Sequence, residues 1–211
     1  MRRVLASFGF GPHAELLQIA IPGFARYAAA HGYDLFIPQA SFFSDEAKSR
    51  PASWMKIPLL KRLFGDGAES VLWLDADVVV KRFDKDISDD CGDHPLHMVV
   101  HRTNDGAVPN AGVMYMRSSF SPHLDSVWDR SGFARSGGWW EQAAVIDLLG
   151  GDPDATPVAV PAGPLWSELP YEWNPHVRDS RGVPAGCRFF HATSFPDRVS
   201  CMREAARDAA T

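Results

Sequence analysis

Residues 71–80 read VLWLDADVVV, and this stretch decides the fold. Two acidic residues, Asp75 and Asp77, interrupt a run that is otherwise apolar. Ionised carboxylates are costly to bury unless they are paired or bound to a cation, so their placement needs a physical reason. A continuous apolar run such as VLWL is typical of a central parallel strand, because helices cover both of its faces. Asp75 then lies at the carboxyl end of that strand, where open α/β sheets bind ligands.

The spacing of the two acids also carries information. In an extended segment, residues two positions apart point to the same side. We therefore expect Asp75 and Asp77 to face one metal ion or one ligand. Hard oxygen ligands favour Mg²⁺ or Mn²⁺, which proteins commonly hold with one or two carboxylates and substrate phosphates. The alternative is that the acids cap a neighbouring helix or pair with arginines at the strand end.

Strands and helices alternate ahead of this stretch. Apolar runs predict strands at 3–9 and 33–37, and helical periodicity predicts helices at 12–31 and 53–64. Residues 39–52 are an expected loop. This order predicts an α/β fold: a single Rossmann-like domain with a mostly parallel central sheet flanked by helices.

Several residues are expected to begin, end or bend these two helices. Gly32 is the expected C-cap of the first helix, and Pro22 with Gly23 should kink or split it. Ser53 is the expected N-cap of the second helix, with Gly65 as its stop.

The second half of the chain is less regular. The expected strands are 96–100, 111–117 and 187–195, and the expected helices are 118–132, 139–150 and 196–210. Residues 151–186 are rich in Gly and Pro, and a long irregular segment inside a compact domain is often functional. Because we find no repeat and no linker, we expect residues 1–211 to form one domain.

Composition limits the classes of function. The chain has 211 residues and a formal net charge of -5, which argues against a general nucleic-acid-binding surface. No apolar run approaches the roughly 20 residues of a membrane span. Three cysteines without a CxxC spacing favour a reduced, cytoplasmic setting. The sequence carries no signal for a particular oligomeric state.

Four segments together resemble a known family. They are SWMKIPLLKRLFGDGAESVLWLDADVVV, NAGVMYMRSS, WWEQAAVIDLL and FFHATSF, at 53–80, 110–119, 139–149 and 189–195. Their order resembles the GT-A fold glycosyltransferases, particularly the galactosyl/xylosyltransferase group (glycosyltransferase family 34) and more distantly the glycogenin-like enzymes. The resemblance implies a GT-A type fold, a nucleoside-diphosphate sugar donor (UDP- or GDP-sugar), an acceptor hydroxyl and Mn²⁺ or Mg²⁺.

The resemblance also implies a metal site. Asp75 and Asp77 match the DxD motif, with Asp77 the more direct ligand and Asp75 contacting ribose or metal. His191 matches the histidine that completes the site. The segment HATSFPDR lacks the Gly and Lys of the glycogenin-like HxxGxxK pattern, so Arg198 is the candidate that would assist at the diphosphate. Its alternative role is that of a solvated residue at a helix start.

The NAGV segment matches the family's donor-sugar segment, which is expected to precede a strand. Asn110 can offer both a donor and an acceptor to sugar hydroxyls, and Gly112 would let the backbone approach closely. A plain turn is the alternative. In this fold the end of the first strand, at Ser7 and Phe8, is the usual place for the base and ribose.

In WWEQ, Glu141 and Gln142 match residues beside the donor sugar in these enzymes. If the reaction retains the anomeric configuration, as the resemblance implies, they would stabilise an oxocarbenium-like transition state or position the donor. Glu141 could equally be a surface acid that complements a helix dipole.

Lys56 and several tryptophans remain without a firm role. Lys56 matches the family's WxK pattern, and a plain lysine on a helix face is the alternative. Aromatic rings are natural sugar platforms, although most tryptophans belong to cores. The four candidates are Trp139, Trp140, Trp166 and Trp173.

Three rival functions stay open. VLWLDADVV also fits haloacid dehalogenase-like phosphatases, in which the first Asp is a nucleophile beside Mg²⁺. Their second acidic pair would have to be Asp152 and Asp154, which precede an expected strand and so fall on the wrong edge. A sugar nucleotidyltransferase would need a basic residue that FGFGPH lacks. A domain that binds nucleotide sugars without catalysis is the third.

Overall fold

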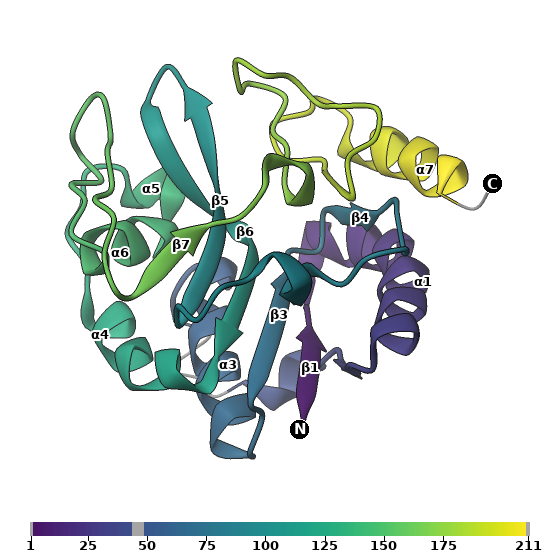
Figure 1. Ribbon diagram of the computed structural model, residues 1–211, viewed down its shortest axis with the longest axis horizontal. Helices are drawn as coiled ribbons and strands as arrows, with labels where there is room; N and C mark the ends of the chain where they lie inside the picture. The colour runs from purple at the N-terminus through teal and green to yellow at the C-terminus, as the bar shows by residue number, and fades with distance from the viewer. Residues whose placement is uncertain (1, 44–48, 210–211) are drawn as a thin grey trace.

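A mixed six-stranded sheet forms the centre of the computed structural model, which describes residues 2–43 and 49–209 (Figure 1). The strand order is β2-β1-β3-β6-β5-β7. The bounds are β1 Arg3–Ala6, β2 Asp34–Phe36, β3 Ser70–Leu74, β5 Leu96–Thr103, β6 Gly106–Arg117 and β7 Trp166–Glu168. Among these strands β6 alone runs against the rest. The expected α/β class with a mostly parallel, helix-flanked sheet is confirmed.

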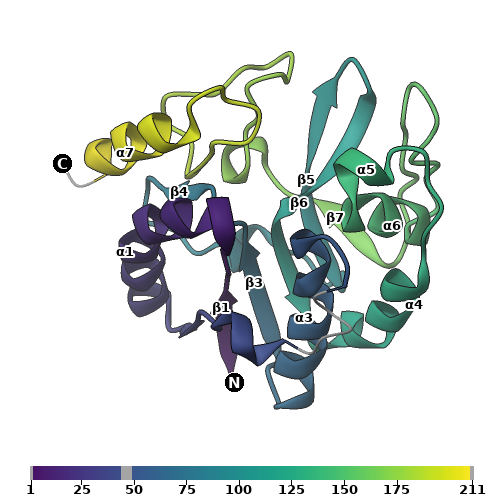
Figure 2. The same ribbon diagram turned by 180° about the vertical axis from the view of Figure 1, so that it is seen from behind.

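The apolar run of β3 has partners on both faces of the sheet. Val71 and Trp73 belong to a core cluster shared with α3 (Lys56–Gly65), α4 (Leu124–Asp129) and α6 (Glu141–Leu148). Leu72 and Leu74 belong to a second cluster with α1 (Ala14–His31) and α7 (Arg198–Asp208). Figure 2 shows α3 and α6 on the near side of the sheet. Alternation along a two-faced strand therefore explains why every residue of VLWL is apolar.

The chain turns sharply after Leu74, which differs from the expected extended segment. Asp75 donates its backbone N–H to Gly112 in β6 at 2.8 Å, and residues 76 and 77 form a turn. Residues 78–80 then start a separate strand, β4 (Val78–Val80), which pairs antiparallel with β8 (Phe189–His191). Thus a turn, rather than strand alternation, brings the two acids together, and β8 delivers His191 to the same place.

The first two helices confirm some expected boundaries and correct others. A three-residue 3₁₀ helix, Gly11–His13, leads into α1, and Gly32 ends α1 in the left-handed conformation with φ 71°. Pro22 lies inside α1, which continues through it as one helix. The N-cap expected at Ser53 is wrong, because a 3₁₀ turn, Ala52–Met55, precedes α3 and no side chain caps either start.

The β5–β6 hairpin is longer than expected and contains the NAGV segment. Residues 110–113 lie inside β6 rather than ahead of a strand. The pairing register shifts between Met98 and Val99. The extra residues of this bulge, 111–113, lie in β6, so β6 bends where it passes the end of β3.

Short elements fill the remainder. They are the 3₁₀ turns Ala40–Phe42, Ile87–Asp90, Ser118–His123 and Tyr171–Trp173, and the helix α5, Ser136–Trp139. The helix expected from residue 139 thus begins at Glu141, and the last helix begins at Arg198, where the Asp197 carboxylate accepts the backbone N–H of Ser200. Parts of the expected loop (44–48) and of the terminal helix (210) lie outside the described residues. No described helix is long and apolar enough to cross a bilayer.

Candidate functional site

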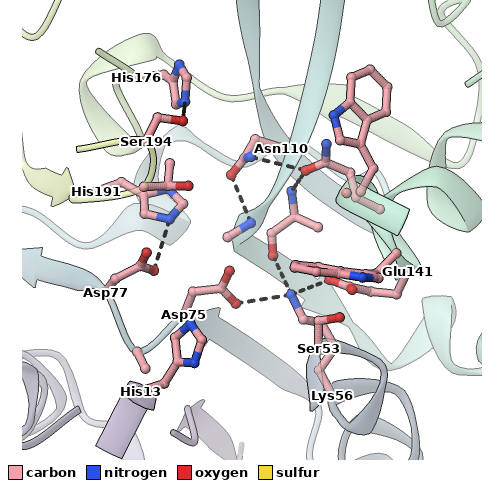
Figure 3. A pocket seen from close by; sticks show the side chains of 18 of the residues that line it. His13, Ser53, Lys56, Asp75, Asp77, Asn110, Glu141, His176, His191 and Ser194 are labelled. Carbon is pink, nitrogen blue, oxygen red and sulfur yellow. Dashed lines mark hydrogen bonds and ion pairs between the residues drawn. The ribbon is translucent and has the colours of Figure 1, made fainter. Parts of the chain in front are cut away.

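A cavity of about 640 Å³ opens where β3 ends (Figure 3). Both candidate acids and His191 line one wall of it, and Lys56, Glu141 and Gln142 line another. These six residues therefore gather in one place, although they come from four separate segments of the chain.

Asp75, Asp77 and His191 form a compact group of possible metal ligands. One ligand atom from each lies within 4.8 Å of the others. His191 Nε2 is 3.2 Å from Asp77 Oδ1, and both residues are buried. Asp75 is a third exposed, and its Oδ2 has no partner in the part of the chain that the structure describes. Two carboxylates and one imidazole are a donor set that fits Mn²⁺ or Mg²⁺.

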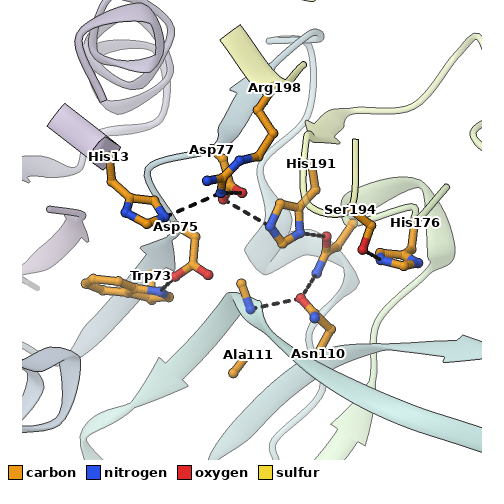
Figure 4. A network of polar contacts seen from close by, with 12 residues as sticks. His13, Trp73, Asp75, Asp77, Asn110, Ala111, His176, His191, Ser194 and Arg198 are labelled. Atoms are coloured by element: carbon orange, nitrogen blue, oxygen red, sulfur yellow. Dashed lines mark hydrogen bonds and ion pairs between the residues drawn. The ribbon is translucent and has the colours of Figure 1, made fainter. Parts of the chain in front are cut away.

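Charge keeps the Asp77 carboxylate ionised. Burial alone would raise its pKa, but attraction to His191 and Arg198 outweighs burial and holds the pKa of Asp77 well below its usual range. Burial would likewise lower the pKa of His191, yet the neighbouring Asp77 raises it. Arg198 Nη1 lies 3.2 Å from Asp77 Oδ2 at the cavity wall (Figure 4).

Lys56 is a buried cation, not a lysine on an exposed helix face. Its Nζ donates to Asp75 Oδ1 at 3.0 Å, to the Ala111 carbonyl at 3.1 Å and contacts Glu141 Oε1 at 2.7 Å. Burial would lower the pKa of Lys56, but Asp75 and Glu141 raise it, so the group stays charged. Its three N–H bonds are all used, and hence Lys56 holds the two acids in place instead of contacting a ligand.

Glu141 lies at the start of α6 and is 4% exposed, so it is not a surface acid. Its Oε2 atom has no hydrogen-bond partner among the described residues. Gln142 beside it uses Oε1 twice, accepting from Asn110 Nδ2 at 3.1 Å and from the Ala111 N–H at 3.0 Å. The amide nitrogen of Gln142 has no hydrogen-bond partner among the described residues, so its two N–H groups are available to donate to a ligand.

Gly112 is required by close packing. A Cβ atom at this position would lie 2.3 Å from His191 Cε1 and 2.9 Å from Asn110 Oδ1. The Gly112 N–H donates to Asn110 Oδ1 at 2.9 Å. The glycine thus lets β6 pass directly under the metal-binding wall, although it does so as part of a strand and not as a plain turn.

The end of the first strand contributes Phe8 but not Ser7. Phe8 lines the cavity and stacks on Phe10, with 5.2 Å between ring centroids. Ser7 is fully buried outside the cavity lining, its N–H bonded to the Phe36 carbonyl at 3.3 Å. The side chain of Ser7 is therefore not placed to meet a base or ribose.

Two of the four candidate tryptophans reach the cavity. Trp139 and Trp140 line it, and Trp140 is 40% exposed. Trp166 and Trp173 are buried, and their indole N–H groups donate to the Pro161 carbonyl and to Asp90.

Three further residues at the site carry no sequence signal. Asn174 is fully buried and bonds to His191, while His101 and His176 stack at 4.8 Å between ring centroids and line the cavity. Burial lowers the pKa of His101 to about 3 and that of His176 to about 4, so both are neutral hydrogen-bonding groups at pH 7. Asn174 and His176 come from the irregular Gly/Pro-rich segment, where no periodicity marks them.

Comparison with solved structures identifies the architecture. A glycosyltransferase involved in the glycosylation of the major capsid of PBCV-1 superposes with a TM-score of 0.69 at 17% identity, over 98% of this chain and 99% of that one. The chain has a GT-A glycosyltransferase fold. GlyE of Streptococcus pneumoniae TIGR4 gives a TM-score of 0.57 at 15% identity over 97% of this chain, which spans 61% of the GlyE chain. Mouse xyloside xylosyltransferase 1 gives 0.50 at 10% identity, over 92% and 98%. The sequence matches no family model and no curated protein.

Proposed function

We propose that the protein is a metal-dependent glycosyltransferase that moves a sugar from a UDP- or GDP-sugar to an acceptor hydroxyl. The observation that carries the proposal is the convergence of Asp75, Asp77 and His191 on one wall of a cavity in a GT-A fold. The special likeness to glycosyltransferase family 34 remains a prediction, since structural neighbours at this identity support the fold alone.

Each wall of the cavity has a separate task. Asp75, Asp77 and His191 would hold Mn²⁺ or Mg²⁺, which when bound neutralises the charge that builds on the diphosphate leaving group. Arg198, which pairs with Asp77 in this structure, has a partly exposed side chain and would turn its guanidinium to the same phosphates. Phe8 is the candidate platform for the base, whereas Ser7 lies outside the cavity lining.

The opposite wall suits the sugar. Gln142 has donors available, and Glu141 keeps one carboxylate oxygen without a partner. As the bond between the anomeric carbon and the phosphate oxygen breaks, positive charge develops on the sugar ring. The Glu141 carboxylate, held by Lys56, would stabilise that charge, and the Gln142 amide nitrogen would donate to a sugar hydroxyl and position the donor; both roles are consistent with retention of configuration.

The phosphatase alternative loses support because its second acidic pair lies elsewhere. Asp154 accepts the N–H groups of Ala134 and Arg135, and Asp152 accepts the N–H of Asp154. Neither carboxylate lines the cavity. A haloacid dehalogenase-like reaction would lack its additional metal ligands here.

Calorimetry with UDP and GDP, each with and without Mn²⁺, tests the proposal. We expect one of the two nucleotides to bind only when Mn²⁺ is present. Asp77→Asn should abolish this dependence on Mn²⁺. Asp93→Asn, a change of the same kind on the exposed surface, should leave it intact. Metal-independent binding, or none, would refute the proposal. Binding without release of nucleotide from any donor sugar would instead favour a non-catalytic nucleotide-sugar-binding domain.

The compartment is a further part of the proposal. Cys91, Cys187 and Cys201 are all free thiols in the structure. Burial raises the pKa of Cys91 to about 12, which makes it unreactive. Unpaired thiols of this kind support a reducing, cytoplasmic setting. Acid quenching of cells followed by labelling of the denatured protein with a thiol reagent tests whether all three are reduced in the cell.

A further inference from the structure

Asn174 joins the two walls of the cavity. Its Oδ1 lies 2.9 Å from His191 Nδ1, and its Nδ2 donates to Asn110 Oδ1 at 2.9 Å. Asn110 in turn contacts Gln142 through its own amide nitrogen. One fully buried side chain thus lies between a candidate metal ligand and the candidate sugar-binding amides.

Backbone N–H groups fix the direction of every hydrogen bond in this chain. The Ala111 N–H can only donate, so the Gln142 atom that it faces must be the carbonyl oxygen Oε1. The Asn110 atom that contacts the same oxygen must then be its amide nitrogen Nδ2. The Gly112 N–H likewise requires Asn110 Oδ1. Asn174 must then offer its own amide nitrogen to Asn110, which turns its carbonyl oxygen toward His191.

The consequence for His191 follows directly. Because Asn174 Oδ1 can only accept, His191 Nδ1 carries the proton. The lone pair that remains available for a metal is therefore on Nε2, the atom that faces Asp77 at 3.2 Å. Outer hydrogen bonds of this kind commonly orient metal-binding imidazoles.

The backbone around Asn174 is held as firmly as its side chain. Its carbonyl oxygen contacts His101 Nε2 at 2.7 Å, and its N–H donates to the Tyr171 carbonyl at 3.2 Å. Trp173, next to it, is fully buried and its indole donates to Asp90 at 2.9 Å. Asn174 therefore has little freedom to turn, which is the property that a positioning residue requires.

We propose that Asn174 is a positioning residue of the glycosyltransferase site: it directs His191 Nε2 to the metal and holds Asn110 against Gln142. This inference rests on the proposed function and adds a residue that acts through two others. The Gly/Pro-rich segment is thereby an integral part of the site.

Mn²⁺ affinity, read from the EPR signal of free Mn²⁺ in the presence of saturating UDP or GDP, tests the proposal without a known acceptor. Asn174→Leu removes both hydrogen bonds and should weaken Mn²⁺ binding about 10- to 100-fold. Asn174→Asp keeps the acceptor for His191 but sets a carboxylate oxygen against Asn110 Oδ1. The Asp variant should change Mn²⁺ affinity by less than about threefold, while it should slow the cleavage of the nucleotide from the sugar of the donor.

A background lacking His191 separates positioning from simple destabilisation. If Asn174 acts through His191, then Asn174→Leu should weaken Mn²⁺ binding by less than about twofold further in a His191→Ala protein. Equal losses in both backgrounds overturn the inference. Should the Leu variant fail to fold, the Asp variant decides, because loss of Mn²⁺ binding in it also overturns the inference.

The outcomes distinguish the two proposals. A wild-type protein that binds no Mn²⁺ with either nucleotide overturns the proposed function and this inference together. A wild-type protein that binds Mn²⁺ through His191, with Asn174→Leu binding it equally well, overturns only the role of Asn174.

Discussion

Replacing Lys56 by methionine should be among the most damaging single changes in this protein. The ammonium group makes three close contacts, at 2.7, 3.0 and 3.1 Å, and its side chain is 2% exposed. Methionine fills a similar volume but leaves the Glu141 carboxylate buried, with neither oxygen paired. Removing one partner of a buried ion pair costs about 3–5 kcal/mol in the free energy of unfolding. For a chain of this length that corresponds to a fall in melting temperature of roughly 10 °C.

Urea unfolding measures this loss, and the chain offers a control on the same helix. Lys61 pairs with Asp125 on the surface, where its side chain is 45% exposed, so Lys61→Met should change the free energy of unfolding by less than about 1 kcal/mol.

A second substitution tests the cause. If the penalty comes from the stranded Glu141 charge, then adding Glu141→Gln to Lys56→Met should recover about 2 kcal/mol of it. The reasoning is refuted if Lys56→Met costs less than about 1 kcal/mol, or if Glu141→Gln lowers the stability of Lys56→Met further.

Three other predictions concern different parts of the molecule. Gly112→Ala should force its new methyl group against His191 and weaken Mn²⁺ binding at least about tenfold in the EPR assay. Gly186→Ala is the control, because nothing lies within 4 Å of its added Cβ and Mn²⁺ binding should not change. Arg198→Gln should weaken the binding of a nucleoside diphosphate about tenfold, and that of the monophosphate much less, as measured by calorimetry. An equal loss of affinity for both nucleotides would remove Arg198 from the diphosphate site. Burial lowers the pKa of His97 from its ordinary value to about 4, so the unfolded chain binds a proton that the native state excludes. As pH falls from about 6.5 to about 4, the free energy of unfolding should therefore decrease more steeply in wild type than in His97→Gln, by about 1.4 kcal/mol per pH unit. Parallel plots of unfolding free energy against pH for the two proteins would contradict this.

The sequence predicted the parts of the fold that depend on local pattern. The two-faced apolar run of β3, the mostly parallel sheet implied by alternating strands and helices, and the placement of Asp75 at a carboxyl strand end all follow from periodicity. Ser53 failed as a cap because it lies inside a 3₁₀ turn, Ala52–Met55, which propensity does not mark. Whether VVV continues β3 or turns away after the acids could not be decided from the sequence, because the turn depends on pairing with β8, more than 100 residues later in the chain.

The candidate site was predictable only as far as its motifs extend. DxD and His191 could be named because carboxylates and imidazole at strand ends have a chemical purpose of their own. Lys56 and Asn174 could not be assigned, since their roles depend on partners 19 and 17 residues or more away, Asp75 and His191, that only the folded chain brings near. A buried lysine and a buried asparagine have no local signature.

The charges around the cavity explain why we expect nucleotide binding to need a cation. Three acids, Asp75, Asp77 and Glu141, face two permanent cations, Lys56 and Arg198, so the group carries one net negative charge when His191 is neutral. A diphosphate approaching this wall would meet Asp77 and Asp75 first and be repelled. A divalent cation on the same two acids reverses the sign of the net charge, and the wall then attracts the phosphates. Lys56 cannot supply that attraction itself, because its three donors are committed to the protein. Under the proposed function, diphosphate recognition would therefore rest on the metal and Arg198 together, so loss of either should reduce the discrimination between a diphosphate and a monophosphate.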